Sequence, residues 1–278
     1  MKKLCKYLHL LQFDIALGAV AISIWFAQLE NIEYNLLISI LLGISVWVIY
    51  TSDHLLDAYR YREQIKGGRY EYFHRNWKVL SVLCIVLAIP SMILAFTLSS
   101  EVWTVGLGLS GIVLLYLFLA HFARSKFFLL KELFVAIIYA GGVLTANIAM
   151  QGFWQISLLF FWLFAVVFCE LLIYSKLELV EDAKMNMPSL TKQYGAKQIC
   201  FIHDLLLGAA FISWLLLSYR YSFALLWILP SSIMLLMMLL FRNKGPLLYQ
   251  KGTHRRYGEL IFMIPWIAIL INFMITTL

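Results

Sequence analysis

Long apolar runs, separated by short polar segments, recur from one end of the chain to the other. A transmembrane helix needs about 20 mostly apolar residues, and backbone polar groups in lipid must be satisfied within the segment, so runs of this length form helices. The short alternating segments typical of a membrane β-barrel do not appear in the sequence. The pattern predicts an all-α polytopic membrane protein with nine transmembrane helices, at about 9–28, 35–57, 77–98, 102–121, 127–150, 154–176, 198–218, 222–241 and 257–277.

Composition supports this class. Of the 278 residues, 63% are hydrophobic and 13% are charged, and the mean hydropathy is +0.84, whereas a soluble domain has roughly 45–50% apolar and about 25% charged residues. A soluble globule, a disordered chain and a secreted disulfide scaffold are thereby excluded. The four cysteines are isolated and predict neither a disulfide framework nor a zinc site. We expect one integral membrane domain over 1–278.

The charged residues predict the orientation. With a cytoplasmic N-terminus, all of the 22 Lys and Arg residues except Arg220 fall on the inner side of the membrane, as the positive-inside rule requires. This explains the net charge of +7 without a nucleic-acid partner. Asp14 interrupts the first run, which is therefore interpreted as a helix and not as a signal peptide. The protein is expected in the cytoplasmic membrane, with its C-terminus outside and its long loops, about 58–76, 178–197 and 242–256, inside.

Two helices end on the inner side in paired acids. Asp53 and Asp57 are i,i+4 neighbours with Tyr50 one turn earlier, and Glu178 and Asp182 repeat the same spacing after the sixth run. Like charges repel, and the partial negative charge of a helix C-terminus disfavours acids there, so a positive group should compensate. The two acidic ends belong to helices four apart in the predicted order, which point the same way.

A divalent cation provides such compensation. Mg²⁺ prefers oxygen ligands and often binds through one or two carboxylates together with substrate phosphates. A single acid pair beside Lys and Arg is more often a salt-bridged membrane edge, but two matching pairs on one side favour metal and diphosphate binding. The basic residues beyond the pairs are candidates to meet the remaining phosphate charge: Arg60, Arg62, Lys66, Arg69, Lys184 and Lys192.

Other polar residues in the apolar runs carry weaker signals. Asp14, Glu170 and the pair His203–Asp204 are costly in lipid and should face the protein interior. Glu170 lies two turns before Glu178 and either lines a pocket below the metal site or makes an interhelical hydrogen bond. Lys131 opens the fifth run and either anchors the membrane edge or contacts a phosphate. The remaining histidines have no metal-ligand spacing and are interpreted as interfacial.

With these features the chain resembles the UbiA-type superfamily of intramembrane prenyltransferases, which has nine helices and two aspartate-rich motifs after helices 2 and 6. The first family motif, usually N-D-x-x-D-x-x-x-D, aligns with the stretch that ends at Asp57. Asp53 and Asp57 match, while the leading Asn-Asp is missing and Tyr50 replaces its acid. Lys131 resembles the basic residue that opens the family's fifth helix.

The second motif is D-x-x-x-D followed by a Gly, a Thr-Leu and a final Gly, and it aligns without a gap. Asp182, Leu190 and Gly195 match, Glu178 and Ser189 are close replacements, and Asn186 stands for the first Gly. The resemblance covers the whole chain by topology and about 30 residues by motif.

The resemblance implies a Mg²⁺-dependent transfer of a prenyl group from a polyprenyl diphosphate to a lipophilic, commonly aromatic, acceptor. Metal ions and basic residues stabilise the leaving diphosphate, and a buried site protects the allylic cation from water. The expected metal ligands and catalytic residues are Asp53, Asp57, Glu178 and Asp182. The expected substrate contacts are Arg60, Arg62, Lys131, Tyr50 and Glu170.

Two other functions remain open from the sequence. The missing first acid is consistent with a catalytically degenerate membrane protein that binds an isoprenoid or a quinone, or with a partner subunit. A small transporter is a third possibility, but transporters place their polar sites near the bilayer midplane, whereas the acidic pairs here lie at the inner surface.

Overall fold

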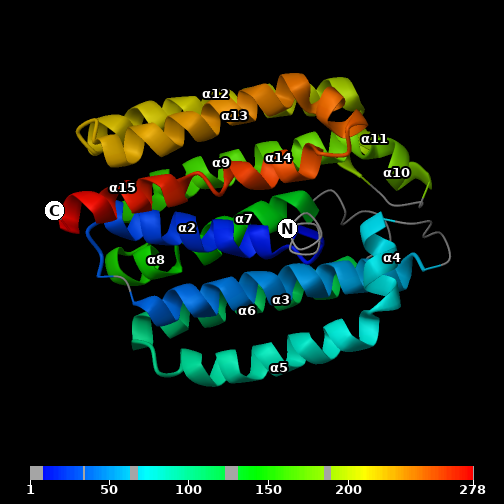
Figure 1. The fold of residues 1–278 in the computed structure, drawn as a ribbon, viewed down its shortest axis with the longest axis horizontal. Coiled ribbons are helices and arrows are strands. Elements are labelled where there is room, and N and C mark those ends of the chain that lie inside the picture. Colours follow the sequence, from blue (N-terminus) through cyan, green and yellow to red (C-terminus); the bar gives the residue numbers. More distant parts are fainter. Residues whose placement is uncertain (1–8, 34, 63–67, 123–130, 185–188, 278) are drawn as a thin grey trace.

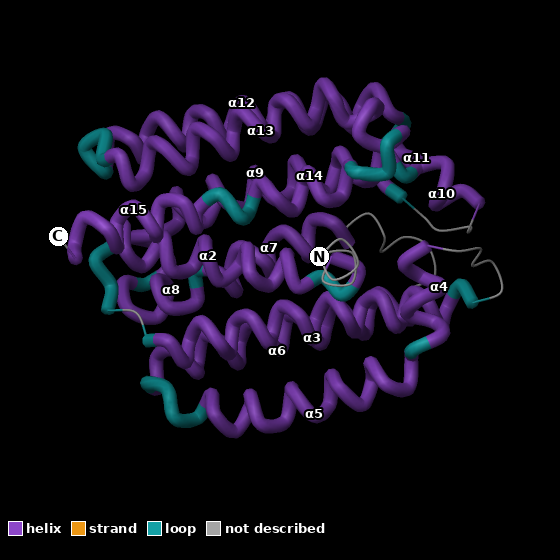
Figure 2. The backbone as a smooth tube through the Cα atoms, viewed as in Figure 1, coloured by secondary structure: helices purple, strands orange, loops and turns teal. Residues whose placement is uncertain are grey.

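The computed structural model describes residues 9–33, 35–62, 68–122, 131–184 and 189–277, and all the regular elements in these residues are α-helices. The long helices lie side by side in a bundle (Figures 1 and 2). The helices are α2 (Phe13–Leu29), α3 (Leu36–Arg60), α4 (Gly68–Arg75), α5 (Trp77–Ala95), α6 (Ser100–Phe122), α7 (Lys131–Val143), α8 (Thr145–Gln151), α9 (Phe153–Leu177), α10 (Leu179–Lys184), α11 (Leu190–Tyr194), α12 (Ala196–Arg220), α13 (Leu225–Gln250), α14 (His254–Ile261) and α15 (Pro265–Thr277).

Every apolar run predicted from the sequence contains a helix. Within the described residues, seven helices are long and apolar enough to cross a membrane, or up to eight if the bent pair α7–α8 is one span. Helix α2 is also apolar but has only 17 residues. The predicted all-helical polytopic fold is confirmed, and the count of nine spans stays a prediction.

Two predicted spans are broken. The run 127–150 bends by 61° between α7 and α8. The Thr145 hydroxyl donates to the carbonyls of Gly141 and Gly142, at 3.1 Å and 2.9 Å, and glycine pairs and inserted side-chain hydrogen bonds are common causes of such kinks. The run 257–277 is divided before Pro265, whose missing N–H cannot continue the ladder.

The inner loop predicted over 242–256 is mostly helical, and that prediction is wrong. Helix α13 continues past Arg242 as far as Gln250. Helical backbone bonding does not need apolar side chains, so a helix can continue with polar side chains where it leaves the apolar region. The chain then turns within three residues into α14, which brings α14 back beside α9 (Figure 1).

Three tryptophan rings pack against one another at the centre of the bundle. Trp25 on α2 stacks on Trp227 on α13 with ring centroids 5.4 Å apart, and Trp162 on α9 meets Trp227 edge-on at 5.0 Å. All three are fully buried, and the Trp25 indole N–H donates to the Leu226 carbonyl at 2.7 Å. Helix α9 is the most buried of the long spans, while α5 and α6 expose apolar faces suited to lipid.

Helices α3 and α9 end at the same end of the bundle. The short helices α4, α10 and α11 follow them and gather there (Figure 1). The two acidic pairs lie at these C-terminal ends, so the fold brings them to one end of the molecule. Helix α7 begins at Lys131 at this end, and the start of α14 completes the arrangement.

Candidate functional site

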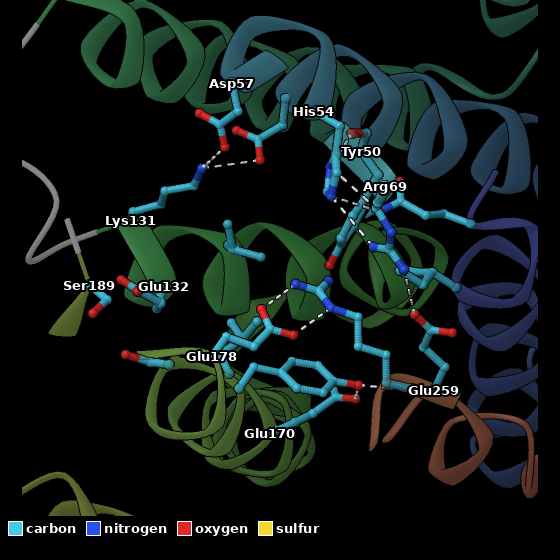
Figure 3. A pocket seen from close by; sticks show the side chains of 18 of the residues that line it. Tyr50, His54, Asp57, Arg69, Lys131, Glu132, Glu170, Glu178, Ser189 and Glu259 are labelled. Atoms are coloured by element: carbon cyan, nitrogen blue, oxygen red, sulfur yellow. Dashed lines mark hydrogen bonds and ion pairs between the residues drawn. The ribbon is translucent and has the colours of Figure 1, made fainter. Parts of the chain in front are cut away.

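A cavity of about 210 Å³ opens between α3, α7, α9 and α14, and its walls include residues from both acidic pairs. Asp53 and Asp57 line one side, and Glu178 and Asp182 line the other. Figure 3 shows Asp57 and Glu178 on opposite sides of the cavity, with Lys131 extending toward Asp57. The fold therefore brings all four acids, from two helix ends far apart in the sequence, to one cavity.

The first acidic pair is bridged by an ammonium group. Lys131 extends its side chain from the first residue of α7, and its Nζ lies 3.0 Å from Asp57 Oδ2 and 3.2 Å from Asp53 Oδ2 (Figure 3). The Tyr116 hydroxyl donates to Asp53 Oδ1 at 2.9 Å. The i,i+4 spacing turns both carboxylates to one face of α3, and Lys131 compensates the repulsion between them.

The second pair is asymmetric, because Glu178 already has strong partners. The Arg255 guanidinium holds it with two hydrogen bonds, one of them from Nε to Oε1 at 2.6 Å, and His254 Nε2 lies 2.9 Å from Oε1. Burial raises the pKa of Glu178, but the charges of Arg255 and His254 outweigh burial and lower it to about 2. Glu178 is therefore an anion at any physiological pH.

Asp182, on α10, is different. Within the described residues its carboxylate has no basic partner, and the nearby carboxylates include Glu178 and Glu132. Burial and these negative charges raise the pKa of Asp182 to about 7, although Arg255 opposes the shift. Glu132 is a neighbour of Lys131, but its Oε2 is buried and has no hydrogen-bond partner in the described part of the chain. Neither acid takes part in a salt bridge among the described residues, although the charge of Arg255 acts on Asp182.

The raised pKa of Asp182 predicts a pH-dependent stability in the absence of divalent cations. The folded state binds this proton with a pKa of about 7, against 3.8 for a free carboxyl, so the stabilisation is full below about pH 4 and is lost as the pH rises through about 7. Thermal unfolding in detergent between about pH 5 and pH 8 should therefore show a falling midpoint. Asp182→Asn should make this slope shallower by removing the contribution of one carboxyl, and Glu33→Gln, an exposed control, should keep it; equal slopes in the two variants would contradict the assignment.

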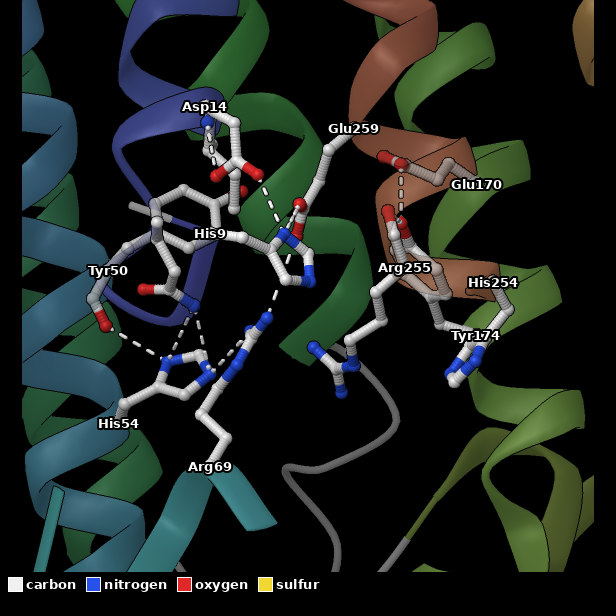
Figure 4. Close-up of polar contacts among 12 residues, drawn as sticks. His9, Asp14, Tyr50, His54, Arg69, Glu170, Tyr174, His254, Arg255 and Glu259 are labelled. Carbon is white, nitrogen blue, oxygen red and sulfur yellow. Dashed lines mark hydrogen bonds and ion pairs between the residues drawn. The ribbon is translucent and has the colours of Figure 1, made fainter. Parts of the chain in front are cut away.

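Below the acids, the wall is formed by aromatic and buried polar groups. Tyr50 and Glu170 both line the cavity, as the sequence predicts. The Tyr174 hydroxyl lies 2.9 Å from Glu170 Oε1 and 3.1 Å from the Arg255 carbonyl oxygen, which ties α9 to α14 (Figure 4). Tyr139 adds a further ring on the α7 side.

This α9–α14 contact depends on Gly258. A Cβ atom at this position would lie 2.5 Å from Glu170 Oε1 and would clash with the Tyr174 hydroxyl. We expect Gly258→Ala to lower the free energy of unfolding by about 1–3 kcal/mol, because overpacking outweighs the gain in helix propensity. Gly208→Ala on α12, where no atom lies within 4 Å of the added carbon, is the control for thermal unfolding. A Gly258→Ala protein as stable as this control would show that the contact is loose.

A partly buried ionic group that the sequence did not predict lies beside the cavity, and two of its members, Arg69 and Glu259, line it. His9 Nδ1 lies 2.7 Å from Asp14 Oδ2 and 2.5 Å from Glu259 Oε2, and Arg69 Nη2 lies 3.6 Å from Glu259 Oε1 (Figure 4). The ligand atoms of His9, Asp14 and Glu259 lie close enough to one another to hold a metal ion. However, His9 and Arg69 already compensate the two carboxylates, and His9 Nδ1 is engaged by both of them.

Not every predicted basic contact reaches the cavity. Lys131 and Arg69 line it, but Arg60 and Arg62 do not. Their guanidinium groups lie over aromatic rings, 5.6 Å from the centroid of Tyr61 and 5.5 Å from that of Tyr59. Lys184 and Lys192 are exposed and are not among the lining residues. Lys66 and Asn186 lie outside the described residues.

The structure adds Arg255, Glu259, His54 and Gln12 to the lining. Gln12 Nε2 lies 3.1 Å from His54 Nε2, and both side chains are buried. In the sequence, Arg255 is one of many basic residues that the positive-inside rule explains, so nothing marks it as a site residue. The sequence could have predicted a buried partner for Glu259, because it is an acid near the start of an apolar run, where a charge needs a partner.

No protein-family model and no curated sequence matches the chain. Among solved structures, a UbiA homologue from Aeropyrum pernix K1, without ligand, matches with a TM-score of 0.73 at 14% identity, covering 94% of this chain and 98% of the other. A UbiA homologue from Archaeoglobus fulgidus bound to DMAPP and Mg²⁺ matches with a TM-score of 0.61 at 15% identity, covering 95% and 99%.

A digeranylgeranylglyceryl phosphate synthase matches with a TM-score of 0.60 at 16% identity, covering 98% of each chain. All three matches extend over nearly the whole length of both proteins. Identities this low establish the fold and not the activity. The chain has the fold of the UbiA superfamily, as its motifs and helix order predict.

Proposed function

We propose that this integral membrane protein is a Mg²⁺-dependent prenyltransferase that moves a prenyl group from a polyprenyl diphosphate to a lipophilic, aromatic acceptor. The observation that carries the proposal is the convergence of both acidic pairs and three cationic side chains on one cavity. The likeness to a UbiA homologue bound to DMAPP and Mg²⁺ supports it. We place the mouth of the site on the cytoplasmic side, where the basic loops are expected.

The cationic side chains fit a diphosphate. Lys131, Arg69 and Arg255 line the cavity on three different helices, α7, α4 and α14. Charge-assisted hydrogen bonds from Lys and Arg to phosphate oxygens are among the strongest in proteins. In the proposed mechanism these residues bind the diphosphate and stabilise the negative charge that accumulates as the allylic C–O bond breaks.

The donor set at Asp182 fits a magnesium ion. Asp182 and Glu132 offer carboxylate oxygens that take part in no salt bridge among the described residues, and the Glu132 Oε2 atom has no hydrogen-bond partner there. Mg²⁺ commonly joins one or two carboxylates to substrate phosphates. When bound there, the metal would neutralise charge on the leaving diphosphate. Asp53 and Asp57 already hold an ammonium group, so their role is to position Lys131.

The deeper wall suits the prenyl chain and the cation formed from it. Tyr50, Tyr139 and Tyr174 present aromatic rings to the cavity, and the faces of such rings attract cations. Exclusion of water protects the allylic cation until an acceptor carbon forms the new bond and loses its proton to the released diphosphate. Glu170, hydrogen-bonded to Tyr174, is the proposed polar contact for the acceptor.

The test is transfer of a labelled prenyl group by the purified chain. A panel of allylic diphosphates of increasing length is offered with a membrane-lipid extract as the acceptor source, with Mg²⁺ or with EDTA. We expect labelled lipid product and released pyrophosphate with Mg²⁺ and neither with EDTA. Equal product in both conditions would contradict the metal dependence, and no product from any donor would contradict the enzyme assignment.

The second candidate is a non-catalytic protein that binds an isoprenoid or a quinone. The replacement of the first motif acid by Tyr50, together with the pairing of Asp53 and Asp57 by Lys131, favours it. It predicts that the chain retains prenyl lipids in the same cavity but releases no pyrophosphate. Measuring bound lipid and pyrophosphate release on one sample separates the two functions.

A further inference from the structure

The first acidic pair differs from the second in that one ammonium group, that of Lys131, contacts both of its carboxylates. Lys131 Nζ lies 3.0 Å from Asp57 and 3.2 Å from Asp53, and it bonds to the Oδ2 atom of each. The side chains of all three residues are mostly buried, with relative exposures of 21%, 17% and 16%. The ammonium therefore occupies the point between the two carboxylates where a bridging cation would sit.

A divalent cation cannot share that point. Mg²⁺ binds its oxygen ligands at about 2.0–2.1 Å, so an ion bridging the same two Oδ2 atoms would displace the ammonium or lie against it. Displacement would leave the Lys131 charge without these two partners. The Tyr116 hydroxyl also occupies Asp53 Oδ1, at 2.9 Å, which leaves fewer free oxygens for a metal.

The residues around Asp53 and Asp57 suit a monovalent cation better than a divalent one. Tyr50 stands one turn before Asp53, on the same face, and contributes a neutral hydroxyl where a third carboxylate would strengthen divalent binding. Two carboxylates and one ammonium together leave a net charge of only about −1. On the opposite side, neither Asp182 nor Glu132 takes part in a salt bridge within the described residues, and Glu132 Oε2 is buried without a hydrogen-bond partner, so we place the divalent cation there.

We propose that the Lys131 ammonium is the resident cation of the Asp53–Asp57 pair and replaces a metal ion there, so that a single divalent cation binds with the diphosphate, at Asp182. This inference rests on the proposed function for the identity of the diphosphate ligand. Lys131 is thereby both a direct diphosphate contact and the structural substitute for a metal. Asp53 and Asp57 are positioning residues for Lys131 and are not metal ligands.

The experiment counts manganese. The purified full chain is saturated with Mn²⁺ and an unreactive allylic thiolodiphosphate, desalted rapidly, and assayed for manganese and phosphorus per chain. We expect one Mn²⁺ per bound analogue in the wild type and in Asp57→Asn, and an apparent Mn²⁺ affinity lowered at least about tenfold in Asp182→Asn. Two Mn²⁺ in the wild type, with one lost in Asp57→Asn, would overturn the proposal.

Lys131 variants provide the converse test. Lys131→Met removes the ammonium at similar length and should let the freed carboxylates bind a second Mn²⁺, whereas Lys131→Arg keeps the charge and should bind one. A single Mn²⁺ in folded Lys131→Met protein would also overturn the proposal. If Lys131→Met does not fold, the comparison of Asp57→Asn with Asp182→Asn decides alone.

The count does not depend on turnover. A chain that binds one Mn²⁺ with the analogue but never transfers a prenyl group loses the proposed function and keeps this inference. A chain that transfers prenyl groups with two Mn²⁺ keeps the proposed function and loses the inference.

Discussion

Arg255→Leu is expected to lower the free energy of unfolding by about 3–5 kcal/mol. The guanidinium is the strongest partner of Glu178, which is 8% exposed and lies at the end of α9. Removing one member of a buried ion pair leaves an uncompensated charge in a poorly solvated site, which costs far more than the net value of the pair. His254, at 2.9 Å, remains beside Glu178 but provides only part of the compensation. Chemical or thermal unfolding in detergent measures the effect.

Two further variants control this prediction. Arg256→Leu removes an adjacent but exposed arginine and should change stability by less than about 0.5 kcal/mol. The double variant Arg255→Leu/Glu178→Leu removes both charges and should recover much of the loss, since no orphan charge remains. If the double variant is as unstable as the sum of the single variants, Arg255 acts through packing and not through Glu178.

Asp182→Asn is expected to lower the rate of prenyl transfer by about 10²–10³-fold. The asparagine keeps the size of the side chain but removes the charge of the one motif acid that has no basic partner within the described residues. Removal of a group that stabilises developing charge in a transition state typically costs this much. The loss should appear in kcat, with a higher Mg²⁺ concentration needed for half-maximal rate.

Asp204→Asn is the matched control. Asp204 lies on α12 outside the cavity, its side chain is 55% exposed, and it pairs with Arg242 at 3.1 Å. Its replacement should leave transfer within about twofold of the wild type, because a largely exposed ion pair contributes little. Equal rates for the Asp182 and Asp204 variants would remove Asp182 from the proposed mechanism.

The membrane fold can be predicted from the sequence because each transmembrane helix is marked by residues that are consecutive in the chain. Apolar runs of about 20 residues must be helices in lipid, and the matching spacing of Asp53–Asp57 and Glu178–Asp182 places equal features on parallel helices. The breaks at Leu144 and before Pro265 were missed, since hydropathy does not report backbone hydrogen bonding. The extension of α13 to Gln250 was missed because polarity marks the membrane surface and not the end of a helix.

The partners of the site residues could not be predicted from the sequence. Arg255 reaches Glu178 across 77 positions of sequence, and Lys131 reaches Asp57 across 74. Such contacts depend on how helices pack, and a basic loop offers many equivalent candidates. Arg60 and Arg62 follow the first acidic pair directly, yet their guanidinium groups lie over the rings of Tyr61 and Tyr59, and neither arginine lines the cavity.

The position of a bound diphosphate tests the central claim most directly. A crystallographic or cryo-electron microscopy structure of the chain with Mn²⁺ and the unreactive allylic thiolodiphosphate would locate both phosphorus atoms and the metal. The account predicts the diphosphate inside the cavity between α3 and the α9–α10 junction, contacting Lys131 on one side and joined through manganese to Asp182 on the other. A diphosphate bound outside this cavity, or held by only one of the two acidic helix ends, would contradict it.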